Sequence, residues 1–313
     1  MRGRLAALLV MLVAARAEAH DHWLVPSKLI TAEPARLAVV WYVGEEFVAE
    51  EEKPFEAARI SRALLLNHVA RAELHGVDGA RPFLDIDVAR GGNLLAVDRI
   101  PTTIELKPRE FEDYLREEDL EGPLAERARR GESNKAGLEK YGRSIKLLVQ
   151  VGDAEDATYG AEIGQSIEII PREDPVHLTP GGVLHVLVKF HGAPIEGVRV
   201  DALSRGDDNV VRTTSGHTAH DGMVALTLDR RATWMVRLVH MVRCDPACDG
   251  MDWQSFWASY VFASARPGVA EIAPPSMIAP QKRSRRAFVL MVVALVIAVA
   301  LGFVVADQRT RRP

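Results

Sequence analysis

Apolar and polar residues alternate most regularly in the segment VLHVLVKFHG. Leu184, Val186 and Val188 share one face of an extended chain there, whereas His185 and His191 share the other. A period of two is typical of a strand with one buried face. Further strands are expected, between Gly and Asp turns, in GAPIEGVRVDALSR, DGMVALTLD, TWMVRLVHM and SFWASYVFA. Residues 176–265 are therefore predicted to form a β-sandwich domain.

The residues before this domain predict another β-rich domain, over residues 20–172. Strands are expected in HWLVPSKLI and ARLAVVWYVG, and shorter ones in RAELHGV, FLDIDVA and GNLLAVDR. The segment IIPREDPVHLTPGG separates the two domains, because prolines and a charge cluster interrupt the strand pattern there. The chain is thus predicted to be mainly β, with two β-sandwich-like domains.

A helical insertion is expected within the first domain, at about residues 107–140. Phe111, Tyr114 and Leu115 recur at helical spacing among dense charges of alternating sign. We expect the helix to break near Gly-Pro at residues 122–123. Its charges are most simply explained as a solvated face.

The two ends of the chain predict export and membrane anchoring. Residues 1–19 have a charged start, an apolar run from Leu5 to Ala15 and an A-x-A cleavage signal, which together indicate a signal peptide. Residues 287–306 are twenty uncharged, almost wholly apolar residues, enough at ~1.5 Å each to cross ~30 Å of hydrocarbon.

This arrangement predicts a single-pass protein of the bacterial inner membrane. Its globular part would lie in the periplasm, joined by a linker (266–286) to the transmembrane helix, and a basic tail (307–313) would lie in the cytoplasm.

Composition excludes some functions. With 39 basic and 43 acidic residues, the net charge of −4 gives no electrostatic basis for binding nucleic acid. The sequence contains no G-x-S-x-G, P-loop, G-x-G-x-x-G or H-E-x-x-H motif, and we expect no enzyme.

The only cysteines, Cys244 and Cys248, lie in the loop-like segment RCDPACDGMDW. Outside the cytoplasm they are expected to form a local disulfide. The alternative is a thiolate metal site, although two sulfurs without another pair are a poor structural zinc site.

Cleavage after Ala19 would give a mature start of His20-Asp21-His22-Trp23. The terminal amine, the next two backbone nitrogens and the His22 imidazole can surround Cu(II) or Ni(II) in one plane. Alternatively, the amine and ring of His20 grip copper together with a further histidine. In the third interpretation the histidines are incidental and the residues from Trp23 onward begin the first strand.

His240 is the candidate for a further ligand at this site. It shares a strand face with Trp234, Val236 and Leu238 in TWMVRLVHM, so it points inward or lies at the rim of the core. A hydrogen-bonded core histidine is the alternative explanation.

Several motifs together resemble an exported bacterial family known as domain of unknown function 4198. They are AHDHWLVPS, FEDYLREEDLEG followed by KYGRSIKLLVQVG, GAPIEGVRV and SFWASYVFA, within residues 20–265. Members are associated with nickel or cobalt uptake. The resemblance implies a β-rich exported module whose second half is similar to the transthyretin-like or carboxypeptidase-regulatory sandwich. The family's His-Asp-x-Trp start corresponds to His20, Asp21 and Trp23, and His22 falls at the variable position.

Two functions are consistent with these features. The first is a membrane-anchored extracytoplasmic protein that binds Ni, Co or Cu at His20 and His22, with His240, and delivers the ion to a transporter in the inner membrane. The second is a structural or interaction module without a metal. A copper enzyme with a histidine brace is a minor alternative.

Overall fold

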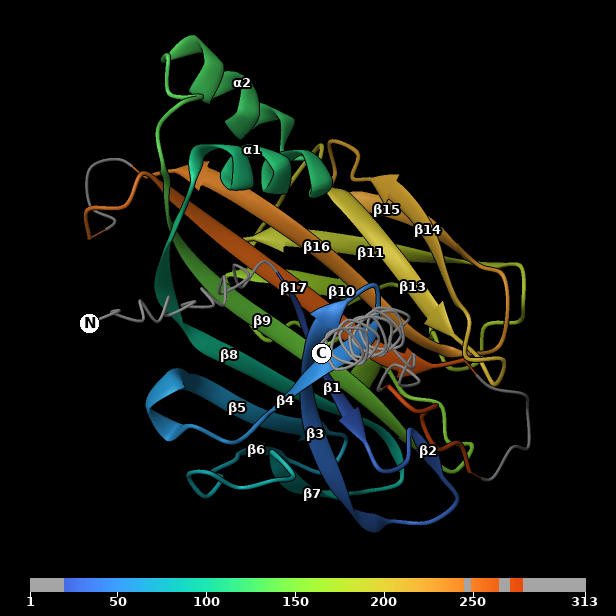
Figure 1. The fold of residues 1–313 in the computed structure, drawn as a ribbon. Coiled ribbons are helices and arrows are strands. Elements are labelled where there is room, and N and C mark those ends of the chain that lie inside the picture. The colour runs from blue at the N-terminus through green and yellow to red at the C-terminus, as the bar shows by residue number, and fades with distance from the viewer. Residues whose placement is uncertain (1–19, 245–248, 265–270, 278–313) are drawn as a thin grey trace, which may run out of the picture. The chain divides into compact units, whose positions relative to one another are not determined.

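A nine-stranded sheet lies at the centre of the computed structural model and contains residues from both halves of the chain (Figure 1). Its strands, in spatial order, are β14 (Val211–His217), β13 (Arg199–Arg205), β16 (Thr233–Arg243), β17 (Trp253–Ala263), β9 (Gly137–Val151), β8 (Gly91–Leu106), β5 (Ile60–Asn67) and β6 (Arg71–Glu73), and β2 (Ile30–Thr31) also pairs with β9. The two halves join where β17 runs parallel to β9. We call this the central sheet.

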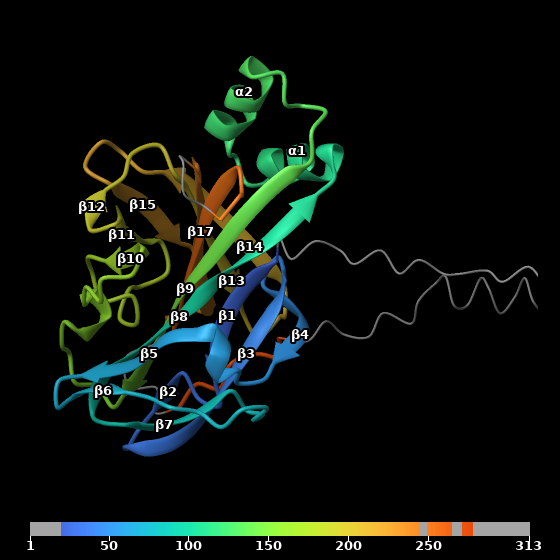
Figure 2. The same cartoon turned by 90° about the vertical axis from the view of Figure 1, so that its left-hand side faces the viewer.

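Two four-stranded sheets cover its two faces (Figure 2). The first, here called the β1 sheet, contains β1 (Asp21–Pro26), β3 (Ala35–Glu45), β4 (Val48–Lys53) and β7 (Leu84–Val88). The other, called the β11 sheet, contains β10 (Ile167–Pro171), β11 (Gly182–Phe190), β12 (Ala193–Pro194) and β15 (Met223–Leu228).

Alternation along β17 shows that these sheets lie on opposite faces. The hydroxyl of Ser259 donates a hydrogen bond to the carbonyl of His22, in β1, at 2.6 Å. The neighbouring residue Tyr260 donates its hydroxyl proton to the carbonyl of Tyr159, beside the β11 sheet, at 2.9 Å. Consecutive strand residues point to opposite faces, so apolar side chains are buried in two layers.

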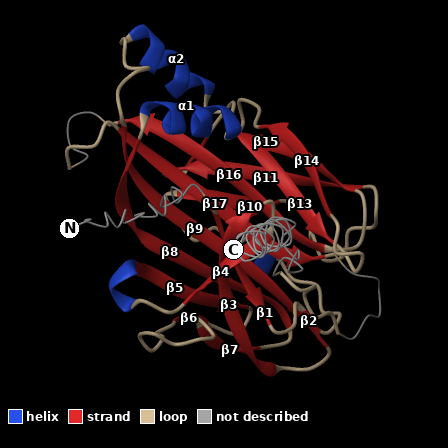
Figure 3. Ribbon diagram, in the orientation of Figure 1, coloured by secondary structure: helices blue, strands red, loops and turns tan. Residues whose placement is uncertain are grey.

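Two helices, α1 (Pro108–Glu117) and α2 (Glu121–Arg129), lie at one end of the central sheet (Figure 3). As predicted, Phe111, Tyr114 and Leu115 are the buried residues of α1. The break differs from the prediction, since it lies at residues 118–120 and the Gly-Pro pair falls in the first turn of α2. Proline is tolerated there because the first turn needs no N–H from it.

The helical prediction also extends too far along the chain. The segment after α2 turns at Gly131, whose φ of +66° favours glycine, and residues 137–140 already belong to β9. A residue with a Cβ at position 137 would meet the ring of Phe111, so the close approach of helix and strand requires Gly137.

The mainly β fold is confirmed, and its sheets cross the predicted division of the chain. The boundary at residues 172–176 falls between β10 and β11, which pair with each other. The central sheet takes strands from both predicted domains. The linker-like segment therefore connects two neighbouring strands of the same sheet, and the chain does not leave the shared core there.

The structure describes residues 20–244, 249–264 and 271–277, and those up to Pro275 belong to one compact unit. The predicted signal peptide, transmembrane helix and tail lie outside these ranges. Within the ranges described, no helix is long and apolar enough to cross a membrane. Two short 3-10 helices, η1 (Ala57–Arg59) and η2 (Thr158–Gly160), complete the elements described.

Candidate functional site at the amino end of β1

The residues that would start the mature protein form the first strand. β1 pairs antiparallel with β3, with Asp21 opposite Gly44 and His22 opposite Val43. Trp23 and Leu24, which follow in the same strand, are fully buried. The prediction that a strand begins at Trp23 is thus close, and the backbone of Asp21 and His22 lies in a sheet instead of a free tail.

His22 is buried, and its ring is held by one hydrogen bond. The indole Nε1 of Trp41 donates to His22 Nδ1 at 3.1 Å, with the two rings edge to face. An indole N–H can only donate, so Nδ1 carries the lone pair and the proton of the neutral ring is on Nε2. Among the described residues, Nε2 has no hydrogen-bond partner.

The charges around His22 are positive. Its pKa is lowered well below the usual value, first by burial and then by Arg143, Arg99 and Lys53. The ring is therefore neutral, but its lone pair is used by Trp41 and its surroundings repel a cation. A planar chelate through His22 does not fit this geometry.

His20 instead lies between two carboxylates. Its Nε2 is 3.6 Å from Glu45 Oε1 and 3.5 Å from Glu50 Oε2, and its side chain is 11% exposed against 60% and 49% for the two acids. One ring nitrogen thus meets two carboxylates that retain access to solvent.

The β3–β4 hairpin brings these acids together. Its turn residues Glu46 and Phe47 have φ of 51° and 56°, and Phe47 is buried edge to face against Trp23. A Cβ at Gly44 would lie 2.0 Å from the carbonyl oxygen of Val48, so the bulge there requires glycine.

Asp21 anchors the same strand from its other side. Arg237 of β16 lies 2.6 Å from Asp21 Oδ1 and donates hydrogen bonds to Glu118, beyond α1, at 2.6 Å and to Asp201 of β13 at 3.3 Å. Arg199 also pairs with Asp201, at 2.8 Å. We call these five residues the Arg237 cluster.

Burial dominates the electrostatics of this cluster. It raises the pKa of Asp21, and it raises the pKa of Glu118 to about 7 although Arg237 opposes that shift. The carboxylates in turn raise the pKa of Arg237, against the effect of its burial. Sequence analysis missed this cluster, although an arginine in the middle of the apolar strand TWMVRLVHM was a signal that a buried partner must exist.

His240 lies on the opposite face of the central sheet. Its ring contacts Phe190 of the β11 sheet, with ring centroids 4.7 Å apart, whereas Arg237, three residues earlier, reaches β1. Burial lowers the pKa of His240 to about 4, and His191 contributes. The structure does not bring His240 to the amino end, because an odd number of residues along a strand reverses the face.

Cys244 is disulfide-bonded, and Cys248 lies outside the described residues. In the part of the chain that the structure describes, no group of three or more His, Cys, Asp or Glu side chains is arranged to hold a metal ion. Two surface cavities, of about 410 and 610 Å³, are lined by residues other than these candidates. The amino end of β1 remains the candidate site because it combines a histidine, two open carboxylates and unpaired buried donors.

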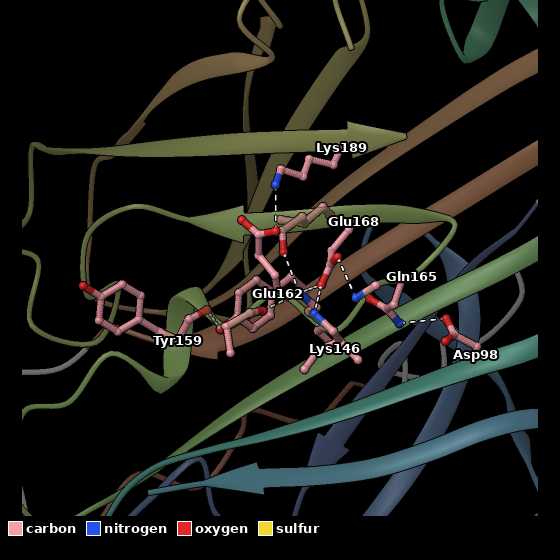
Figure 4. A network of polar contacts seen from close by, with 12 residues as sticks. Asp98, Lys146, Tyr159, Glu162, Gln165, Glu168 and Lys189 are labelled. Atoms are coloured by element: carbon pink, nitrogen blue, oxygen red, sulfur yellow. Dashed lines mark hydrogen bonds and ion pairs between the residues drawn. The ribbon is translucent and has the colours of Figure 1, made fainter. Parts of the chain in front are cut away.

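A buried ion pair on the face of the β11 sheet differs in character (Figure 4). Lys146 Nζ donates to Glu168 at 2.7 Å and to the carbonyls of Ala161 and Ile169 at 3.2 and 3.1 Å. Glu168 also accepts the backbone N–H groups of Ile163 and Gly164. The three protons of the ammonium are all used, so we interpret this pair as a structural link between sheets.

The family model of a domain of unknown function, DUF4198, matches residues 17–242. The match ends within β16 and includes His20, Asp21, Arg237 and His240. The chain belongs to this family. No curated protein matches it.

Proposed function

We propose that this DUF4198 protein is a membrane-anchored, extracytoplasmic protein that binds a divalent nickel, cobalt or copper ion at His20 and delivers it to a transporter. The observation that carries the proposal is the approach of two carboxylates, Glu45 and Glu50, to the same ring nitrogen of His20 at 3.6 and 3.5 Å. Imidazole and carboxylate are ligands that such ions accept.

Processing would complete the ligand set. Removal of residues 1–19 would leave the α-amine on His20, beside its own imidazole. Metal–ligand bonds are about 2.0–2.2 Å long, so the exposed carboxylates would have to close on the ion. The site would thus form only on the cleaved chain.

Export and anchoring are part of the proposal, through the signal peptide (1–19) and the transmembrane helix (287–306). A tether would raise the effective concentration of the bound ion near a membrane transporter. For residues 176–265 we propose a transthyretin-like or carboxypeptidase-regulatory sandwich.

The alternative is an interaction module in which His20, Glu45 and Glu50 form ordinary surface ion pairs. The absence of a preformed metal cluster in the described chain favours it. A histidine brace has less support, because Trp41 occupies the lone pair of His22 and His240 lies on the other face.

Titration calorimetry of the full chain with Ni(II), Co(II) and Cu(II) tests the proposal, once mass spectrometry has verified His20 as the first residue. One ion should bind, and the double substitution Glu45→Gln, Glu50→Gln should weaken it by about tenfold or more. The matched control is Glu46→Gln in the same turn.

A chain that retains Ala19 should lose most of the affinity, since its α-amine is displaced. The site would be refuted if the chains that begin at Ala19 and at His20 bound the ion equally, or if the double variant and the parent chain did. No binding by any of the three ions would favour the interaction module.

A further inference from the structure

Several buried donors near the amino end have no hydrogen-bond partner among the described residues, and the indole Nε1 of Trp23 is one of them. Two others are His22 Nε2 and Arg99 Nη1. Leaving such a group unpaired costs about 1–3 kcal/mol, and more when it is charged. In the Lys146–Glu168 pair, by contrast, every ammonium proton has a partner.

The register of the strands places Arg99 on the face of the central sheet that β1 covers. Arg99 of β8 lies directly opposite Arg143 of β9, so their side chains share a face. The guanidinium of Arg143 lies 4.2 Å from the ring centroid of Trp257, two residues before the serine that holds the His22 carbonyl. This is the face that β1 covers.

The surroundings are positive as well as rich in donors. Two guanidinium groups, those of Arg99 and Arg143, lie on this face of the central sheet, and Lys53 belongs to the β1 sheet that covers it. Lys53 lies opposite Trp41, the residue that fixes the His22 tautomer. Such surroundings favour an anion, because an anion would accept both N–H groups and reduce the repulsion among the cations.

We propose that His22 Nε2–H and Arg99 Nη1–H bind one carboxylate group of a small organic acid. A carboxylate offers two oxygens to two separate donors. The carboxylates of Asp21, Glu45 and Glu50 at this end of the strand disfavour a doubly charged phosphate. Arg99 is half-buried, so part of its side chain lies at the surface although Nη1 itself is buried.

A consequence for the metal ion follows, and it rests on the proposed function. If His20 binds the metal, the ion arrives as a complex with an organic carboxylate. The metal would then meet His20, Glu45 and Glu50 while its organic ligand meets His22 and Arg99.

Calorimetric titration of the metal-free full chain with succinate tests the anion site, with phosphate and chloride as comparison probes. Succinate should bind, and Arg99→Gln should weaken it by about tenfold, as expected for the loss of a charge-assisted hydrogen bond. Arg36→Gln, an exposed arginine paired with Asp85 and Asp87, is the control and should have no effect. The ¹⁵N resonance of His22 Nε2 should shift on binding in the parent chain.

No succinate binding, or equal weakening by both variants, would overturn the proposal. Equal affinity for succinate, phosphate and chloride would mean an adventitious ion only. Succinate should also tighten Ni(II) binding in the parent chain and not in Arg99→Gln. Succinate binding without any metal binding would refute the proposed function and leave the anion site standing.

Discussion

The two faces of the central sheet each bury a network of charged side chains, and the two networks differ in how completely their hydrogen bonds are made. On the face of the β11 sheet, Lys146 and Glu168 are 1% and 3% exposed, and backbone groups complete their hydrogen bonds. On the face of the β1 sheet, Arg237 meets three carboxylates, and several donors nearby, including His22 Nε2 and Arg99 Nη1, lack acceptors among the described residues. A buried ion pair whose hydrogen bonds are all made stabilises the fold. A buried region in which donors lack acceptors indicates a place where a ligand is expected.

The largest effects are expected from removing the central cation of either network. Lys146→Met and Arg237→Met should each destabilise the protein by about 3–5 kcal/mol, because a buried charge loses its partner. The Arg237 substitution should have the larger effect at pH 7, since it leaves three carboxylates facing one another. Urea denaturation monitored by tryptophan fluorescence measures both.

A larger effect of Lys146→Met would contradict this comparison. Arg212→Met removes an exposed partner of Asp229 and is the control for the loss of an arginine. It should change stability by less than about 1 kcal/mol.

A smaller effect is expected in the pH dependence of stability. The pKa of Glu118 is raised from 4.5 to about 7 in the folded protein, so between these values the native state binds more protons than the unfolded state. The contribution of Glu118 is therefore fully present below pH 4.5 and is lost as the pH rises through 7.

Glu118→Gln should flatten the fall in unfolding free energy between pH 4.5 and 7. Glu117→Gln, its exposed neighbour on the chain, should leave the profile unchanged. Identical profiles for Glu118→Gln and the parent chain would show that this carboxyl is ionised throughout the range.

The smallest effect is expected at His240. Because it contacts Phe190 on the other face, His240→Gln should leave metal affinity at the amino end unchanged. Calorimetry of the cleaved chain measures it. A loss of affinity similar to that in the Glu45, Glu50 double variant would mean that the two faces share one site.

Local sequence patterns predicted the elements better than their assembly. Leu184, Val186 and Val188 are buried as their alternation predicted, and α1 buries the expected residues. The parallel pairing of β17 with β9 joins segments about a hundred residues apart, and no local pattern encodes that contact. The strand at residues 60–67 was missed because its short apolar run lacks alternation.

The sequence located the candidate site and His20 within it, but it did not point to Glu45 and Glu50. The start His20-Asp21-His22 is distinctive, yet burial of the His22 ring depends on Trp41 in a different strand. Glu45 and Glu50 approach His20 only through a hairpin with a bulge at Gly44. A β-bulge adds one residue to a strand and so changes which side chains share a face. Such a bulge is hard to predict from the alternation of apolar and polar residues.

Diffraction at a metal absorption edge, from crystals of the cleaved chain grown with Ni(II), tests the central claim most directly. The account predicts one anomalous peak, within bonding distance of the His20 amine and ring and of the carboxylates of Glu45 and Glu50. A peak at His22 or His240 without His20, or no peak on a chain verified to start at His20, would contradict it.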